Sequence, residues 1–196
     1  MISALPPRLA FVDLETTGSR ATLDAITEIA ILRVEDGREV GRWQSLVQPG
    51  RLIPSFSVHL TGITNAMVAD APTFTDLADT VSQWLDGCVF AAHNASFDRA
   101  FLARAFTSLG QTFDPKVLCT LKLARVLYPG HYRHGLDALI ERHGLICSAR
   151  HRAMGDVEAL WQFVQGIERE LAPELIGAAL KRVMKVKKTR RTALAT

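Results

Sequence analysis

The chain has 196 residues, a net charge of +3, and a composition of 48% hydrophobic and 22% charged residues, which is typical of one globular domain. No run approaches 18 apolar residues, and residues 1–8 lack the basic and long apolar regions of a signal peptide, so we expect a cytoplasmic protein without membrane association. Cys88, Cys119 and Cys147 are odd in number and far apart, which argues against a disulfide framework or a zinc cluster and indicates reduced cysteines.

The first third of the chain has the pattern of three strands. Apolar runs over residues 8–14 and 26–34 are followed by Asp36-Gly37, a pair typical of tight hairpin turns, and by a return strand over residues 39–47. Three consecutive strands with a tight turn between the last two predict an antiparallel meander. Prolines at positions 49 and 54 then predict a loop.

From residue 73 onward, helical patterns alternate with short apolar runs. Thr73, with Asp76 three residues later, has the signature of a capping box for a helix that continues to about residue 85. Short strands are predicted over residues 88–92 and 116–120, and further helices over 96–109, 121–127, 136–143 and 154–171. This order predicts an α/β fold, in which a mixed sheet of an antiparallel meander plus parallel strands is flanked by helices.

The end of the chain differs from the rest in charge. Residues 181–191 contain seven basic residues and no acidic one, so the remainder of the chain is mildly acidic. We predict a folded domain over residues 1–175 and a flexible basic tail over residues 176–196. Such a tail contacts nucleic acid or another polyanion, or it is simply a solvated terminus.

Two acids one residue apart, Asp13 and Glu15, stand at the end of the first apolar run. Strand side chains alternate between faces, so both carboxylates project to the same side. Two negative charges that close stay ionised at neutral pH only if a positive charge lies near them. Hard oxygen ligands suit Mg²⁺ or Mn²⁺, so this pair predicts a divalent metal site.

Two further segments place an acid at the boundary between elements. Asp98 follows a buried strand where a helix begins, and Asp156 lies where a loop enters the last long helix. Each acid could merely complement a helix dipole. Together with the first pair, however, they suffice to hold two divalent ions that clamp the attacking and leaving oxygens of a phosphoryl displacement. His151 lies five residues before Asp156 and is a candidate general base, since an unperturbed imidazole has a pKa of about 6.5.

These segments resemble the three motifs of the DnaQ-like 3′–5′ exonucleases of the DEDDh group. Residues 13–18 match D-x-E-T-T-G, residues 93–98 match H-N-x-x-F-D, and residues 151–156 match H-x-A-x-x-D. The stretches 59–64 and 118–121 resemble further segments of the family, and the resemblance covers about residues 8–170. It implies a ribonuclease-H-like mixed sheet flanked by helices, in agreement with the fold predicted above.

The resemblance also implies a role for individual residues. Asp13, Glu15, Asp98 and Asp156 would bind two Mg²⁺ or Mn²⁺ ions, with Asp13 bridging both, and His151 would be the general base. The residues that it places along the substrate are Thr16 and Thr17 at the 3′-terminal sugar, His59 and Leu60 beside the last nucleotide, and Asn94 and Phe97 along the path of the strand.

The function implied by the resemblance is a 3′–5′ exonuclease that releases nucleoside 5′-monophosphates from nucleic acid with a free 3′ end, with single-stranded DNA favoured. A different function is that of a proofreading subunit that docks on a DNA polymerase, similar to the polymerase III epsilon subunit. Only about 25 residues follow the predicted last helix, which favours a free-standing nuclease. The family also includes RNA-trimming exoribonucleases, whereas the four acids argue against a nucleic-acid-binding module without turnover, because they would repel phosphates. A homodimer is compatible with each of these functions.

Overall fold

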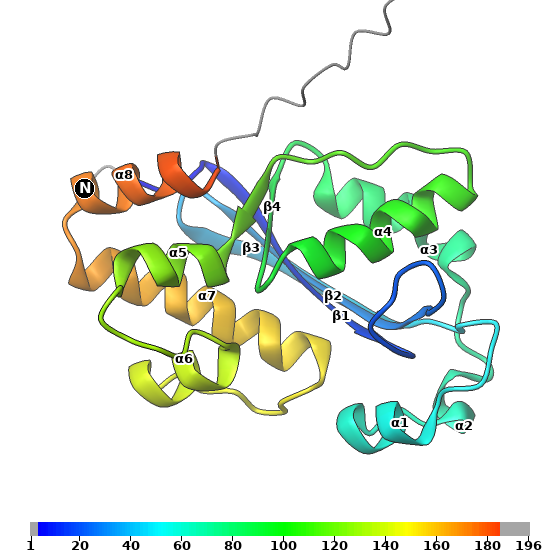
Figure 1. Cartoon of the computed structure of the whole chain (residues 1–196). Helices are drawn as coiled ribbons and strands as arrows, with labels where there is room; N and C mark the ends of the chain where they lie inside the picture. Colours follow the sequence, from blue (N-terminus) through cyan, green and yellow to red (C-terminus); the bar gives the residue numbers. More distant parts are fainter. Residues whose placement is uncertain (1–3, 185–196) are drawn as a thin grey trace, which may run out of the picture.

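The computed structural model describes residues 4–184, which form a five-stranded mixed sheet covered by helices on both faces (Figure 1). The strands are β1 (Arg8–Thr16), β2 (Ile26–Glu35), β3 (Arg38–Leu46), β4 (Val89–Ala92) and β5 (Val117–Cys119). Their order is β3-β2-β1-β4-β5. The pairs β1–β2 and β2–β3 are antiparallel, whereas β1–β4 and β4–β5 are parallel. The predicted fold class is therefore confirmed.

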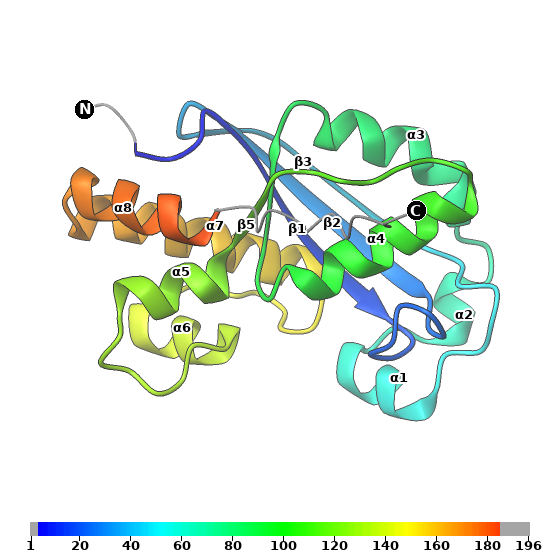
Figure 2. The same cartoon turned by 45° about the horizontal axis from the view of Figure 1, so that its top comes forward.

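Strand β1 lies in the middle of the sheet because both of its faces are apolar. Leu9 and Phe11 pack into one core, and Ala10 and Val12 pack into the other. The helices of the first core are α5 (Thr120–Leu127), α6 (Leu136–His143), α7 (Ala153–Glu170) and α8 (Pro173–Val183). The opposite face is covered by α3 (Phe74–Leu85) and α4 (Ser96–Ser108). Figure 2 shows these two groups on either side of the sheet.

Two local signals in the sequence are confirmed in detail. Asp36 and Gly37 both adopt positive φ angles, 47° and 74°, as the hairpin between β2 and β3 requires. Thr73 caps α3, and its side chain accepts a hydrogen bond from the Asp76 N–H while the Asp76 carboxylate accepts one from the Thr73 N–H at 2.8 Å. Short-range patterns of this kind fix the boundaries of elements that position the sheet.

The loop predicted at Pro49 and Pro54 is present, but two short helices that the sequence pattern did not indicate follow it, α1 (Ser55–Thr61) and α2 (Asn65–Val68). They stand beyond the end of β1, where β2 begins (Figure 1). Pro54 is the residue directly before α1. A proline there costs no helical hydrogen bond, since the first N–H groups of a helix have no partner within it.

The predicted boundary between domain and tail also needs correction. The last long helix ends near residue 171 as predicted, but Pro173 then begins a further helix, α8. Helix α8 buries Ile176, Ala179 and Leu180 in the core, so the packed domain extends past residue 176 to at least Val183. Most of the basic segment, residues 185–191, lies outside the described residues. Within residues 4–184, none of the helices combines the length and the apolar composition that crossing a bilayer requires.

Candidate active site

The four acids of the sequence motifs lie around one cavity at one end of the sheet. Because β1, β4 and β5 run parallel, their carboxyl ends meet at this end, where ligands of open α/β sheets commonly bind. The cavity has a volume of about 260 Å³. Its lining includes Asp13, Glu15, Asp98, Asp156, His151, Asn94 and Phe97 among the predicted site residues, together with Leu14, His93, Leu136 and Arg150.

Asp13 and Glu15 come from β1 and share a side of the strand, as predicted. Glu15 is buried and stands opposite Glu28 in the antiparallel register with β2. Burial, followed by the charges of Asp156 and Glu28, raises the pKa of Glu15 to about 8. Burial and then the neighbouring acids, Asp98 first, raise the pKa of Asp13 well above its ordinary value. The ionised forms of these two carboxylates are therefore destabilised, and a bound cation would stabilise them.

Asp98 and Asp156 enter the cavity from the first turns of two different helices. Asp98 belongs to α4, and burial raises its pKa to about 7, partly offset by hydrogen bonds from backbone groups at Asp98 and Leu14. Asp156 belongs to α7, and burial raises its pKa while Arg150 opposes that effect. Both carboxylates lie near a helix N-terminus, whose dipole favours negative charge. The helix dipoles thus favour the ionised carboxylates that burial in the cavity disfavours.

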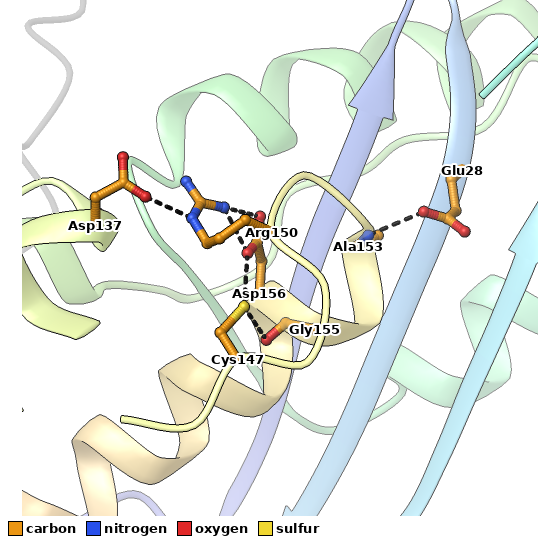
Figure 3. Close-up of polar contacts among 7 residues, drawn as sticks. All are labelled: Glu28, Asp137, Cys147, Arg150, Ala153, Gly155 and Asp156. Carbon is orange, nitrogen blue, oxygen red and sulfur yellow. Dashed lines mark hydrogen bonds and ion pairs between the residues drawn. The ribbon is translucent and has the colours of Figure 1, made fainter. Parts of the chain in front are cut away.

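The start of α7 is held by a buried acid that the motifs do not include. The Glu28 carboxylate accepts a hydrogen bond from the Ala153 N–H at 2.9 Å and another from Arg152 Nη2 at 2.7 Å, and the bond to Ala153 is drawn in Figure 3. Arg152, the residue before the helix, makes no side-chain cap of its own. Glu28 therefore positions the helix turn that carries Asp156.

Gly155, next to Asp156, packs directly against the loop that precedes α7. A Cβ atom at this position would lie 2.3 Å from the backbone carbonyl oxygen of Ala149. We expect Gly155→Ala to destabilise the protein by about 2–3 kcal/mol, because backbone cannot move aside as a flexible side chain can. It should also lower kcat, since the displaced loop carries His151. Thermal unfolding and steady-state kinetics measure both effects.

Gly166 provides a matched control on the same helix. A Cβ there would meet no atom within 4 Å, so Gly166→Ala should stabilise α7 by about 0.5–1 kcal/mol. Equal behaviour of the two alanine variants would show that the contact between Gly155 and Ala149 has no energetic weight.

Arg150 is a site residue that the sequence motifs did not indicate. Its Nη1 lies 2.5 Å from both carboxylate oxygens of Asp156, and its Nε lies 2.6 Å from Oδ1 of Asp137 on α6 (Figure 3). The only signal in the sequence was its position directly before His151. Through these contacts Arg150 links Asp137 on α6 to Asp156 on α7 along the cavity wall.

His151 follows in the same loop with a left-handed backbone, φ 57°. Side-chain ligand atoms of Glu15, His151 and Asp156 all lie within 4.8 Å of one another. Carboxylate oxygens and imidazole are suitable donors for a divalent cation, and the carboxylates favour Mg²⁺ or Mn²⁺ over softer metals. These three residues thus fit a divalent-cation site, and Asp13 and Asp98 line the same cavity.

His93 lies at the end of β4 and belongs to the wall of the cavity. Its Nδ1 lies 3.0 Å from the Thr120 hydroxyl, which in turn donates to the Ala92 carbonyl. Burial lowers the pKa of His93 to about 4, so the ring is neutral. This connection joins the second motif, residues 93–98, to the start of α5.

The predicted substrate contacts fall into two groups. Asn94 and Phe97 line the cavity, and His59 and Leu60 are exposed on α1, which is attached to the end of β1 by a hydrogen bond from Ser57 to the Thr17 carbonyl. The side chain of Thr17 is fully buried and accepts a hydrogen bond from the Ala25 N–H. The side chain of Thr17 therefore holds the turn after β1 in place, and Thr16 and Thr17 together remain a proposed contact with the substrate.

Comparison with known proteins agrees with this geometry. The exonuclease family RNase_T matches residues 10–163. The 3′–5′ exonuclease DinG of Staphylococcus saprophyticus is 36% identical over 159 residues, which cover 81% of this chain and 18% of that protein. A DNA polymerase III subunit epsilon-like protein of Rhodobacter capsulatus is 42% identical over 159 residues, covering 78% of this chain and 23% of that protein. The chain thus spans about a fifth of the length of these two relatives.

A solved structure extends the comparison to a protein of similar length. Exonuclease X, in complex with 5′ overhanging duplex DNA, is 30% identical and superposes with a TM-score of 0.67, covering 88% of this chain and 99% of that one. The family match, the fold and the four acids around one cavity lead to the same assignment. The chain belongs to the DnaQ-like exonuclease family of the DEDDh group.

Proposed function

We propose that this chain is a metal-dependent 3′–5′ exonuclease that releases nucleoside 5′-monophosphates from the free 3′ end of nucleic acid. The observation that carries the proposal is the arrangement of Asp13, Glu15, Asp98 and Asp156 around one cavity with His151 in its wall. Four buried or half-buried acids serve no packing purpose, since their mutual repulsion destabilises the fold.

This arrangement supports a role for each residue. The four carboxylates would hold two divalent cations, Mg²⁺ or Mn²⁺, and Asp13 would contribute to both sites. When bound, such ions lower the pKa of a water molecule and stabilise the attacking and leaving oxygens of the displaced phosphate. His151 accepts the proton of the attacking water, as its place beside Glu15 and Asp156 allows.

Residues beyond the acids would select the 3′ end. Asn94 and Phe97 lie in the cavity wall, and we propose that they line the path of the strand. Leu60, which is 53% exposed on α1, would pack against the last base, with His59 beside it. Residues 16–17 would meet the terminal sugar. The exonuclease X complex contains duplex DNA, which favours DNA over RNA as the substrate of this chain, and we propose that single-stranded DNA is preferred.

A second candidate function is proofreading in association with a DNA polymerase. It is favoured by relatives named DNA polymerase III PolC-type and epsilon-like. Co-purification of the chain with a polymerase, and a rate of hydrolysis that rises on its addition, would support this candidate. Unchanged hydrolysis with and without the polymerase would favour the free-standing nuclease, and light scattering on the same samples would distinguish a monomer from a homodimer.

The main proposal is tested with matched DNA and RNA oligonucleotides that carry a 5′ label. With Mg²⁺ or Mn²⁺, we expect products shortened one nucleotide at a time from the 3′ end, faster on DNA than on RNA. EDTA should abolish the products, and a 3′-phosphate on the substrate should slow them strongly. Internal cleavage independent of the 3′ end, or no hydrolysis with either metal, would contradict the assignment.

The pKa of Glu15 gives a prediction about pH. Its pKa rises from the ordinary 4.5 to about 8 in the folded, metal-free protein, so between these pH values the native state retains a proton that the unfolded chain has released. The metal-free protein should therefore lose stability as the pH rises from 5 to 8. Thermal unfolding in EDTA should show this loss for the wild type and a smaller loss for Glu15→Gln.

Metal binding should show the opposite dependence. A cation requires the ionised carboxylate, so Mn²⁺ affinity should rise with pH over the same range and binding should release protons. Equal pH profiles of thermal stability for the wild type and Glu15→Gln would contradict the raised pKa.

A further inference from the structure

The guanidinium of Arg150 lies where a cation bound to Asp156 would have to be. Its Nη1 is 2.5 Å from both oxygens of the Asp156 carboxylate, so one nitrogen contacts both negatively charged atoms. Cys147 Sγ approaches the same carboxylate, 3.7 Å from Oδ1. Figure 3 shows these groups converging on Asp156. Because Asp156 is only 4% exposed, there is little room for a further partner on the same oxygens.

Arg150 also compensates charge at three of the four motif acids. Its positive charge lowers the pKa of Asp13, Glu15 and Asp156 against the burial that raises them. Arg152, the neighbouring cation, is paired with Glu28 and lowers the pKa of Glu15 as well. Within residues 4–184, the pair between Arg150 and Asp156 is the only ion pair that any of the four motif acids forms. Arg150 thus supplies one positive charge at the place where a divalent ion would supply two.

The second partner of Arg150 makes displacement feasible. Its Nε pairs with Asp137 at 2.6 Å, and the Asp137 side chain is 79% exposed. A guanidinium presents several donors in a fixed fork, so Arg150 can release Asp156 and keep Asp137. After such a move its charge would be shared with an acid at the solvent-exposed rim and would leave the buried carboxylate free.

We infer that Arg150 is a built-in counter-cation that occupies Asp156 in the metal-free protein, competes with the divalent metal for that carboxylate, and stays paired with Asp137 when the metal displaces it. This inference rests on the metal centre of the proposed function. It assigns to Arg150 control over metal affinity, whereas a permanent structural ion pair would remain in place with metal bound.

The test compares Mn²⁺ binding by the wild type and Arg150→Gln, followed by electron paramagnetic resonance of free Mn²⁺. The variant should bind Mn²⁺ about tenfold more tightly, the size expected from removing one charge-assisted hydrogen bond that the metal must break. Arg125→Gln is the control for net charge. Arg125 is exposed on α5 and acts on His93 by charge alone, so its removal should change Mn²⁺ affinity much less.

Thermal unfolding supplies a second readout. In EDTA, Arg150→Gln should unfold at a lower temperature than the wild type, because the buried acids lose their counter-charge. With saturating Mn²⁺ this difference should shrink, since the metal supplies that charge in both proteins. A purely structural role predicts the same loss of stability in both conditions.

The outcomes separate this inference from the proposed function. Unchanged or weaker Mn²⁺ binding by Arg150→Gln, with normal binding by the wild type, would overturn the role of Arg150 and leave the metal centre intact. Absence of Mn²⁺ binding by both proteins would overturn both. Tighter binding by Arg150→Gln than by Arg125→Gln supports the competition.

Discussion

Asp13→Asn is expected to lower kcat by at least about 10³-fold, because the bound metal ions contribute several kcal/mol to the transition state and Asp13 is proposed to contact both. The same variant should unfold at a higher temperature than the wild type in EDTA. Burial and the acids around it, Asp98 first, raise the pKa of Asp13, so its ionised form opposes folding at neutral pH. Asparagine removes that charge with almost no change in shape.

The expected loss of kcat and the expected rise in unfolding temperature have opposite signs, so together they distinguish a catalytic role of Asp13 from a structural one. Asp79→Asn is the matched control, since Asp79 is exposed on α3 and its replacement should change neither kcat nor stability. Loss of activity together with a lower unfolding temperature would show that Asp13 supports the fold rather than the chemistry. Retention of activity by Asp13→Asn would contradict the proposed metal centre.

Much of the fold could be predicted because its decisive signals are local. The hairpin at Asp36-Gly37 and the capping box at Thr73 depend on residues within three positions of each other. The helices that follow two of the prolines were missed for a physical reason. Proline is excluded from a helix interior but suits a helix start, so Pro54 directly precedes α1 and Pro173 begins α8.

The site shows the same division between local and distant information. The acids could be assigned because each lies in a short motif at the end of an element. Glu28 could not be, because its role depends on Arg152, a partner 124 positions away. A glutamate in an apolar strand can be recognised as buried only when the helix that packs over it is known. Arg150 was missed because it lies in the loop before α7 while its partner Asp137 lies on α6, and nothing in the spacing indicates that contact.

His151→Gly is expected to lower kcat by about 10²–10⁴-fold, the usual contribution of a general base. Glycine suits the position, because His151 has a φ of 57° and glycine adopts positive φ without strain. The loop should therefore keep its shape, and Mn²⁺ binding should change little. Free imidazole added to the reaction should restore part of the activity, since it can enter the space left by the side chain and accept the proton.

Asp13→Asn is the control for rescue, because imidazole cannot replace a lost carboxylate and should leave that variant inactive. The competing role for His151 is direct metal ligation. It is suggested by the ligand atoms of Glu15, His151 and Asp156, which lie within 4.8 Å of one another. A ligand role predicts that His151→Gly binds Mn²⁺ much more weakly and that excess Mn²⁺, rather than imidazole, restores hydrolysis. Rescue by imidazole at unchanged Mn²⁺ affinity requires a proton acceptor, because a neutral imidazole in solution adds a base to the cavity without repairing a metal site.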